Sequence, residues 1–326
     1  MRNYFTRFIK SMFSASMCLM VAASALPDRA HAADDFPTRP MTYMITFNPG
    51  GQSDREARRQ EPMLKELLGQ NVLIDYKVGG GGALGWKELV TSKPDGYTFA
   101  GFNIPHTILQ PMLQEVGYKT DQLVPVCIFQ RTYLGLAVPV DSPYKTYEEF
   151  IAAAKKAPGK MKLCGSGSLS GHHIALLSLQ KQAGVRMTYI PETGSATQMT
   201  GFLGGHYDAI IANSDDLVRF RDKARILAVT SAERLKLFPD VPTFKEKNLD
   251  IVLSIDRGVA LPPGAPDNVV RTLEKAFLNI ANRPEVIEAQ TREGFTPVAM
   301  GHDECIAYIK EMTTFYGDIL KSTRGK

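Results

Sequence analysis

The sequence predicts a two-lobed α/β protein, in which two mostly parallel sheets flanked by helices are joined by two crossing strands. Short apolar, β-favouring runs alternate with helix-permissive segments along most of the chain. The alternation pauses at Pro158-Gly159 and then restarts, which indicates a second sheet. The helical segments from 266 to 321 have no sheet of their own, so we expect them to pack back onto the first lobe. The chain then crosses between lobes near 131–135 and near 254–261; a single larger α/β domain is the alternative.

The N-terminal segment has the pattern of a secretory signal. Arg2, Arg7 and Lys10 precede a largely apolar stretch at 12–26, and Ala30-His31-Ala32 has the small-x-small form of a cleavage site. We expect residues 1–32 to be removed on export, which predicts a periplasmic or otherwise secreted protein. No later segment has the length and apolarity of a membrane span, so the mature chain is expected to be soluble.

Charge and cysteine content argue against several classes of protein. Loss of residues 1–32 removes four basic residues and one acid, which lowers the formal net charge from +4 to about +1. A chain so nearly neutral gives no argument for nucleic-acid binding. Cys127, Cys164 and Cys305 remain, with neither paired nor metal-like spacing, and we expect no disulfide framework, metal or cofactor.

The expected elements follow the alternation in order. In the first part of the chain we expect strands at 43–47, 72–78, 97–102, 124–129 and 133–140, and helices at 55–68, 84–91 and 144–157. After the restart we expect strands at 161–164, 185–190, 208–212, 224–230 and 259–261, and helices at 172–183, 196–203, 266–281, 284–291 and 303–321. The first lobe would comprise 33–132 plus 255–326, and the second lobe 133–254.

The stretch Phe47–Asp54 is the first candidate anion site. Pro49-Gly50-Gly51 separates an apolar strand from a helix, and we expect Ser53 or Asp54 to be the N-cap. Backbone amides at such a helix start, together with the helix dipole, favour a carboxylate or phosphate. The alternative is a tight turn that binds nothing.

A second glycine-rich turn, Gly80-Gly-Gly-Ala-Leu-Gly85, has the GxGxxG spacing of dinucleotide-binding proteins. We reject that interpretation because no acid ends the following strand at 97–102 and because the motif follows the second strand, not the first. What remains is a turn whose amides can approach an anion closely.

Two further turns lie in the predicted second lobe. Gly165–Gly171 is rich in serine, and Gly194-Ser-Ala-Thr197 begins another helix. The first is not a nucleophile elbow, because no serine there has glycine two residues away on both sides. His172 and His173 point about 100° apart on a helix, so they do not face one metal or one serine together. A secreted hydrolase using Ser168 or Ser170 with His172 is nevertheless a rival hypothesis.

Near the predicted crossovers lie Arg131 and Arg257, either of which can pair bidentately with an acid. An interlobe or surface ion pair is the commoner fate of such an arginine. Trp86 and Tyr133 can pack on a ligand, but core packing is the stronger expectation for each.

The order of motifs resembles the Bug receptors, which are the extracytoplasmic solute-binding proteins of tripartite tricarboxylate (TctC-like) transporters. The resemblance runs from Pro37 to about Leu320. Its carriers are Phe47-Asn-Pro-Gly-Gly-Gln-Ser-Asp54, Val78-Gly-Gly-Gly-Gly-Ala-Leu-Gly85, Lys93-Pro-Asp-Gly-Tyr-Thr98, Ala157-Pro-Gly-Lys160, Gly194-Ser-Ala196, Leu203-Gly-Gly-His-Tyr-Asp208, Leu227-Ala-Val-Thr-Ser231, Pro239-Asp-Val-Pro-Thr243 and Leu261-Pro-Pro-Gly-Ala-Pro266.

This resemblance implies a periplasmic binding protein of the type II-like flytrap class, acting as a monomer and not as an enzyme. It would capture a small mono- or dicarboxylate and pass it to membrane transporter subunits, holding the acid mainly through amides and hydroxyls. Asp54 would orient the first loop without contacting the ligand. The expected ligand-binding residues are Asn48, Gly50, Gly51, Gln52, Ser53, Gly81, Gly82, Ala83, Ser166, Gly167, Ser168, His172, Ser195, Ala196, Asn213 and Arg257.

Three positions depart from the family pattern and leave the substrate open. Gln52 replaces a usual glycine, Glu192-Thr193 stands where Tyr-Lys is frequent, and His172-His173 replaces a common Thr-His or His-Leu pair. Glu192 would oppose an acid unless it faces away or meets an amine. A sensor that presents its ligand to a signalling kinase would share the same pocket, and the sequence does not separate it from a transport receptor.

Overall fold

The computed structural model describes residues 36–324, and Pro37–Lys326 form one compact unit. The predicted signal sequence, residues 1–32, lies outside the described residues. Within 36–324 no helix combines the length and apolarity that crossing a bilayer requires.

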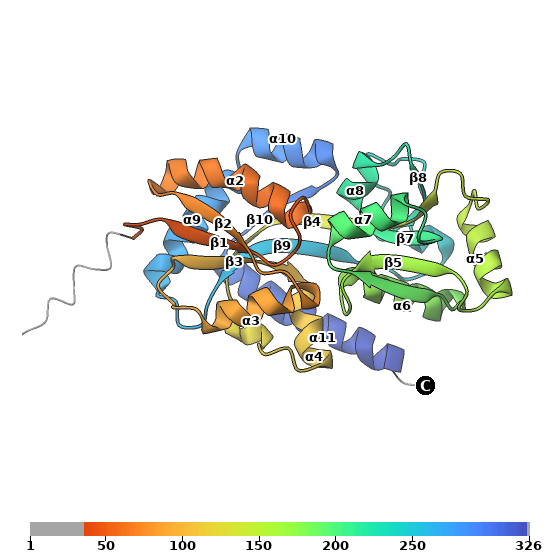
Figure 1. Ribbon diagram of the computed structural model, residues 1–326, viewed down its shortest axis with the longest axis horizontal. Coiled ribbons are helices and arrows are strands. Elements are labelled where there is room, and N and C mark those ends of the chain that lie inside the picture. Colours follow the sequence, from red (N-terminus) through yellow and green to blue (C-terminus); the bar gives the residue numbers. More distant parts are fainter. Residues whose placement is uncertain (1–35, 325–326) are drawn as a thin grey trace, which may run out of the picture. The chain divides into compact units, whose positions relative to one another are not determined.

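The centre of the unit is a mixed sheet with strand order β2-β1-β3-β9-β4-β7-β5-β6, in which β8 and β10 also pair with β4 (Figure 1). The strands are β1 (Met41–Ile45), β2 (Val72–Tyr76), β3 (Thr98–Ile104), β4 (Val124–Pro139), β5 (Lys162–Ser166), β6 (Thr188–Glu192), β7 (Ala209–Asn213), β8 (Ala224–Val229), β9 (Ser254–Leu261) and β10 (Thr296–Met300).

The long strand β4 divides this sheet into two halves. It pairs antiparallel with β9 as far as Tyr133, opposite Ser254, and from Leu134 it pairs antiparallel with β7. We call residues 37–133 and 254–324 half A, and residues 134–253 half B. The two strands expected at 124–129 and 133–140 are therefore one, because the polar residues between them continue the ladder.

Parallel pairing is confirmed in the interior of each half. In half A, β1 is parallel to β2 and β3, and in half B, β5 is parallel to β6 and β7. Antiparallel pairing is confined to the strands that meet at β4 and β9. Since the carboxyl ends of parallel strands share one edge of a sheet, the turns that leave β1 and β3 are brought to a common edge.

Helices flank both halves, mostly where the sequence predicts them. They are α2 (Gln52–Leu68), α3 (Ala83–Thr91), α4 (His106–Leu113), α5 (Tyr147–Lys156), α6 (Gly171–Ala183), α7 (Ser195–Leu203), α8 (Ser214–Arg219), α9 (Asp267–Ala281), α10 (Pro284–Glu293) and α11 (His302–Arg324), with short 3-10 turns at Gly80–Gly82, Thr120–Gln122 and Lys245–Lys247. Local signals explain several boundaries: Thr146 and Glu149 form a capping box at α5, and Gly69 and Gly184 end α2 and α6 in left-handed conformation.

The C-terminal segment differs from expectation in one respect. Strand β10, between α10 and α11, pairs with β4, so these terminal helices do bring a strand to the sheet. Helices α9 and α11 pack on β4 as predicted, and α11 also contacts α4 in half A and α6 in half B. The short helices α4 and α8, which follow directly after β3 and β7, were not predicted.

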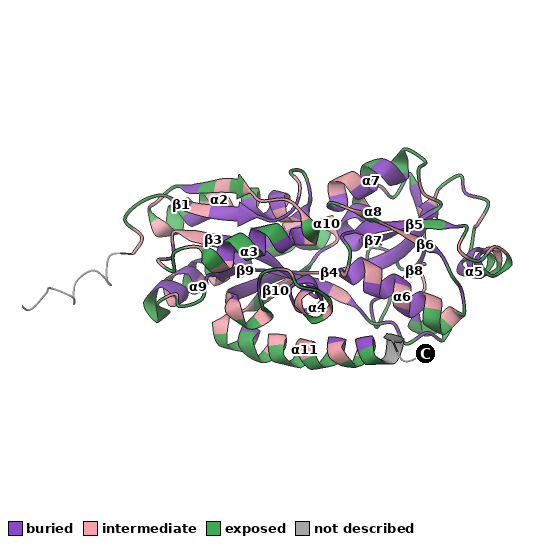
Figure 2. Cartoon of the chain, turned by 60° about the horizontal axis from the view of Figure 1, so that its bottom comes forward, coloured by how far each residue is buried: buried purple, intermediate pink, exposed green. Residues whose placement is uncertain are grey.

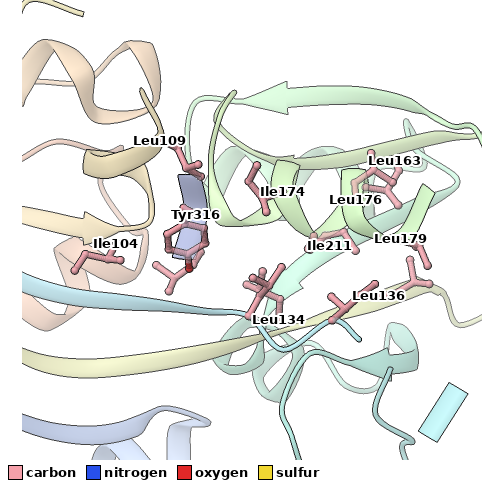
Figure 3. Packing of buried hydrophobic residues seen from close by; sticks show 14 of the residues in the cluster. Ile104, Leu109, Leu134, Leu136, Leu163, Ile174, Leu176, Leu179, Ile211 and Tyr316 are labelled. Atoms are coloured by element: carbon pink, nitrogen blue, oxygen red, sulfur yellow. The ribbon is translucent and has the colours of Figure 1, made fainter. Parts of the chain in front are cut away.

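The apolar core is continuous across the two halves. One cluster includes Ile104 and Leu109 of half A together with Leu134 and Ile174 of half B, and Tyr316 of α11 packs among them (Figure 3). The central strands β1, β3, β9, β4 and β7 are largely buried, whereas α11 shows an exposed outer face (Figure 2). In this conformation the halves therefore rest directly on each other.

Candidate functional site

The first helix start lies at the carboxyl end of β1. Gly51 is the N-cap of α2 and has no side-chain cap bond, so the expectation that Ser53 or Asp54 caps the helix is wrong. The Asp54 carboxylate instead accepts a 2.7 Å hydrogen bond from the Gly50 amide, which gives Asp54 its loop-orienting contact. Among the described residues the amides of Gln52, Ser53 and Asp54 donate to no acceptor.

The start of α7 faces this turn from half B. Gly194 is the N-cap without a side-chain cap bond, and the amides of Ser195–Thr197 find no acceptor within residues 36–324. A Cβ placed on Gly51 would lie 3.4 Å from the Ser195 hydroxyl oxygen, and one on Gly194 would lie 3.6 Å from the Asn48 nitrogen. Two helix starts from different halves therefore meet at close range.

The other two predicted glycine turns also meet, and several of their amides are already engaged. A Cβ on Gly167 would lie 3.3 Å from the Gly81 Cα, so these backbones touch across the halves. The Gly167 amide donates to the Glu192 carbonyl at 2.7 Å, the Gly82 amide donates to Gly79, and the Ala83 amide donates to Gly80. This pair of turns forms a close backbone contact, and these amides are not free to bind a ligand.

A small pocket of about 20 Å³ lies where the halves meet. Its lining residues are Phe47, Gln52, Ser53, Asn103, His106, Ser166, Ser195, Asn213, Ile255 and Arg257. A volume of this size holds about one water molecule. A carboxylate ligand therefore enters only if the halves separate or the lining side chains move.

Six of the predicted residues line the pocket and ten do not. The six are Gln52, Ser53, Ser166, Ser195, Asn213 and Arg257. Asn48, Gly50, Gly51 and Ala196 belong to the opposed helix starts, Gly81, Gly82, Ala83 and Gly167 belong to the engaged turns, His172 lies buried behind Ser166, and Ser168 is exposed.

The prediction missed Phe47, Asn103, His106 and Ile255. Phe47 lies within the first motif and Ile255 within a predicted crossover. Asn103 and His106 flank the carboxyl end of β3, which shares an edge with β1. Polar residues at the carboxyl end of a strand beside β1 are the sequence signal that could have placed Asn103 and His106 in the site.

Arg257 is the charged group of the pocket and is only 4% exposed. Its Nη1 donates to the Thr132 hydroxyl at 2.6 Å, and its Nη2 donates to the Gln52 side-chain oxygen. Burial lowers the pKa of Arg257 to about 10, so the guanidinium stays charged at neutral pH.

Asp215 of α8 links the pocket to α2. Its carboxylate accepts hydrogen bonds from the Gln52 amide nitrogen and from Arg55, both across the two halves. Burial raises the pKa of Asp215, against the lowering effect of Arg55. Burial, and then the neighbouring Asp215, raise the pKa of Asp216 to about 7. These contacts fasten half B to half A beside the pocket.

Two buried imidazoles complete the surroundings of Arg257. The Nδ1 of His172 lies 2.9 Å from the Ser166 hydroxyl oxygen, and burial lowers the pKa of His172 to about 4. Burial, with His172 and Arg257 nearby, also lowers the pKa of His106 well below its usual value. Both rings are therefore neutral at physiological pH. Within residues 36–324 no group of three or more His, Cys, Asp or Glu side chains is placed to hold a metal.

The geometry does not assemble the hydrolase that was considered as a rival. The Ser170 hydroxyl donates to the Gly167 carbonyl and caps α6, and Ser168 is exposed. His172 contacts Ser166 instead, and its Nε2 has no partner among the described residues. Within residues 36–324 no acid forms a hydrogen bond to this imidazole, as a serine–histidine–acid triad would require.

Comparison with known proteins agrees with this geometry. The family described as Tripartite tricarboxylate transporter family receptor matches residues 57–324. The chain belongs to this family. The UPF0065 protein in the gbd 5' region of Cupriavidus necator is 31% identical over 307 residues, which cover 93% of each chain.

Solved structures share the fold of this chain. One described as a periplasmic transporter has a TM-score of 0.84 at 27% identity and covers 89% of this chain and 98% of its own. MatC from Rhodopseudomonas palustris, solved with bound malate, has a TM-score of 0.82 at 23% identity, covering 87% and 99%. The two-lobed periplasmic binding-protein fold is thereby confirmed.

Two other charged residues, Glu192 and Arg131, contact protein groups outside the pocket. The Glu192 carboxylate accepts a hydrogen bond from the Tyr207 hydroxyl and does not line the pocket. Arg131 pairs with Asp256 and donates to the Tyr308 hydroxyl, so it is an ion-pair residue and not a pocket residue. Of the two crossover arginines, only Arg257 reaches the pocket.

Proposed function

We propose that this protein is a periplasmic receptor that captures a small organic carboxylate between its two halves and delivers it to the membrane subunits of a tripartite tricarboxylate-type transporter. The observation that carries the proposal is the meeting of the α2 and α7 starts, one from each half, with amides that find no acceptor in the described part of the chain. A helix start is a ready-made anion site, and two such starts address one carboxylate from both sides.

The same arrangement explains how ligand binding would couple to closure. A carboxylate that accepts hydrogen bonds from α2 and α7 together is bound more tightly when the halves are close, so it shifts the population toward the closed form. Pockets for small molecules usually measure several hundred Å³, well above the 20 Å³ seen between these halves. Ligand entry therefore needs an opening movement.

For that movement we place the lobe boundaries at 33–132 plus 255–326 and at 133–254. The change of pairing partner along β4, between Tyr133 and Leu134, supports this division. The bend would occur in the two crossing segments, while α11, which contacts both halves, would limit its extent. We expect the receptor to act as a monomer and without enzymatic turnover; sedimentation and an esterase assay test these two points.

A periplasmic location is part of the proposal. It is supported by the export pattern of residues 1–32 and by the family to which the chain belongs. Proteins of the same fold have been solved with adipate and malate bound, both from Rhodopseudomonas palustris. In this chain the helix-start amides without an acceptor among residues 36–324, together with Arg257, support a carboxylate as the ligand.

Isothermal titration of the exported form against a panel of carboxylates tests the proposal. The panel should include aliphatic, aromatic and amino acids. We expect saturable binding of at least one small aliphatic acid and none of its neutral amide analogue. Absence of binding across every class would contradict a carboxylate receptor. Uptake of the bound acid by cells that carry the transporter subunits, and its loss without this receptor, separates transport from signalling.

A further inference from the structure

Arg257 is a buried cation that touches no carboxylate of residues 36–324, although the buried carboxylates of Asp215, Asp216 and Asp256 lie near enough to act on its charge. Three other arginines near the junction of the halves pair with carboxylates: Arg55 with Asp215, Arg131 with Asp256, and Arg219 with Asp216. Among the described residues Arg257 forms no ion pair, although it is more buried than any of these three. Burying a charge is costly unless it is paired and hydrogen-bonded. Each of these three carboxylates is bonded to another arginine, so the lack of a direct anionic partner for Arg257 within residues 36–324 calls for an explanation.

The hydrogen bonds of Arg257 show which part of the guanidinium is available. Nη1 is held by the Thr132 hydroxyl, which fixes the plane of the group. Nε and Nη2 form the opposite edge, the two-pronged edge that carboxylates bind bidentately. Nη2 donates to the Gln52 oxygen, while the buried Nε has no partner among the described residues. The Gln52 oxygen is thus the one acceptor within residues 36–324 at an edge of the guanidinium that has two donors, Nε and Nη2.

Gln52 is held in that position from its other end. Its amide nitrogen donates to Asp215, which directs its oxygen toward Arg257. A neutral amide oxygen is a weaker acceptor for a guanidinium than a carboxylate oxygen. Gln52 therefore occupies, with one atom, the place where a carboxylate would make two charge-assisted bonds.

Other unpartnered polar atoms surround this edge of the pocket. The Nδ1 of His106 and the Oδ1 of Asn213 are buried and lack hydrogen-bond partners within residues 36–324, and both residues line the pocket with Arg257. Ser195, at the start of α7, lines the same pocket. The pocket thus combines two kinds of anion anchor: neutral helix-start amides and one charged guanidinium.

We propose that Arg257 binds a second acidic group of the ligand by displacing the Gln52 oxygen, so that this receptor selects dicarboxylates over monocarboxylates of the same length. This inference rests on the proposed function, because the first carboxylate is the one held at the starts of α2 and α7. The bound diacid would span from these helix starts to the Nε–Nη2 edge.

Matched acids test the inference directly. Isothermal titration would compare succinate with butyrate, glutarate with pentanoate, and adipate with hexanoate, on the wild-type chain and on Arg257→Gln. We expect at least one diacid to bind about 10- to 100-fold more tightly than its monoacid, as for hydrogen bonds to a charged group. In Arg257→Gln the ratio should fall to within about threefold, and Arg257→Lys should restore only part of it.

Arg131→Gln is the matched control, because Arg131 lies at the same crossover but contacts Asp256 and Tyr308 outside the pocket. It should keep the wild-type ratio. Thermal melts of all variants establish that they are folded. Should Arg257→Gln not fold, Gln52→Ala gives a second test, since removal of the displaced oxygen should raise the diacid-to-monoacid ratio.

The outcomes separate this inference from the function beneath it. Equal affinity for diacids and monoacids, an unchanged ratio in Arg257→Gln, or a ratio abolished by Gln52→Ala would overturn the role of Arg257 while leaving a carboxylate receptor. Absence of binding for every acid would overturn both.

Discussion

Two pairs of glycine turns meet between the halves of this receptor, and they differ in what their amides do. At Gly51 and Gly194 the helices α2 and α7 begin with amides that donate to no acceptor among residues 36–324. At Gly82 and Gly167 the amides donate to nearby carbonyls. The first pair is suited to bind an anion, and the second pair to bring two backbones together.

The difference teaches that a glycine-rich strand-to-helix turn does not by itself predict an anion site. Gly81 and Gly82 have left-handed backbone conformations and form a short 3-10 turn, in which the Gly82 amide donates to the Gly79 carbonyl and the Ala83 amide donates to the Gly80 carbonyl. Gly51 has an extended conformation, and the chain passes directly into the helix. There the three amides that follow Gly51 find no acceptor within residues 36–324.

The largest expected effect is on stability, at Gly82. A Cβ there would lie 2.5 Å from the Trp86 ring, and the φ of +99° disfavours any side chain. Gly82→Ala should lower the free energy of unfolding by about 3 kcal/mol through overpacking and backbone strain. Gly51→Ala, with ordinary φ, should cost less than about 1 kcal/mol but weaken ligand binding. Urea titrations measure both, and equal destabilisation would erase the distinction between the turns.

The next effect is on binding, at Ser195. Ser195→Asp adds a negative charge to the first turn of α7, which favours the helix but repels a carboxylate. We expect affinity for the best acid of the panel to fall about 30-fold, with an unchanged melting temperature. Ser168→Asp, on the exposed part of the other turn, is the control and should leave affinity within about twofold. If Ser168→Asp lowers the affinity more than Ser195→Asp does, the assignment of the anion site to the α7 start is wrong.

Two substitutions within the predicted site test which of the turns contact the ligand. Gln52→Glu and Ser166→Asp each place a carboxylate on the pocket lining, and both should repel an anionic ligand, with affinity reduced about tenfold. Titration calorimetry on both variants measures this. Unchanged binding in either would remove that residue from the ligand site.

A pH effect is expected from Asp216, which follows β7 beside the pocket. Its pKa is raised from an ordinary 3.8 to about 7, chiefly by burial, so between about pH 4 and pH 7 the folded protein holds a proton that the unfolded chain has lost. The stabilisation is fully present below about pH 4 and is lost as the pH rises through 7, which amounts to about 3 kcal/mol between pH 5 and pH 8. Asp216→Asn should flatten this slope, and the exposed control Asp222→Asn should not. Denaturation at pH 5 and pH 8 provides the measurement.

The smallest effect is expected at Tyr76, which supports the first turn indirectly. Its hydroxyl donates to Asp54 at 2.6 Å, and Asp54 in turn holds the Gly50 amide. Tyr76→Phe removes this part-buried hydrogen bond and an exposed one that the hydroxyl accepts from Arg58, and should cost about 1 kcal/mol of stability. Affinity should fall about two- to threefold, because the Gly50 loop is less firmly oriented. A calorimetric affinity identical to the wild type would show that the loop needs no such support.

Much of the fold could be predicted from the sequence because its elements carry strong local signals. The alternating strands and helices, the two crossovers and the packing of α9 on the sheet all follow from apolar periodicity and turn residues. The short helices α4 and α8 and strand β10 escaped prediction, because each is brief and α4 contains Pro111. Their existence depends on tertiary packing more than on local sequence.

The candidate site was predictable only in part, for a physical reason. The sequence places Gly51 and Ser195 near helix starts. It does not show which backbone amides there already donate hydrogen bonds to acceptors of the protein itself. Similarly, Arg257 was recognised near a crossover, whereas Asn103 and His106 join it only because β3 and β1 share an edge. The network from Arg55 through Asp215 to Gln52 depends on contacts between residues some 160 positions apart in the chain.

The most direct test of the central claim is a nitrogen-15 NMR titration of the receptor with the best carboxylate of the panel. The amides of Ser53 and Ala196 should shift strongly as they bind the acid, because they lie at the open starts of α2 and α7. The amides of Gly82 and Gly167 should shift much less, since they already donate to protein carbonyls. The reverse pattern, with the engaged turns responding and the helix starts silent, would contradict the account.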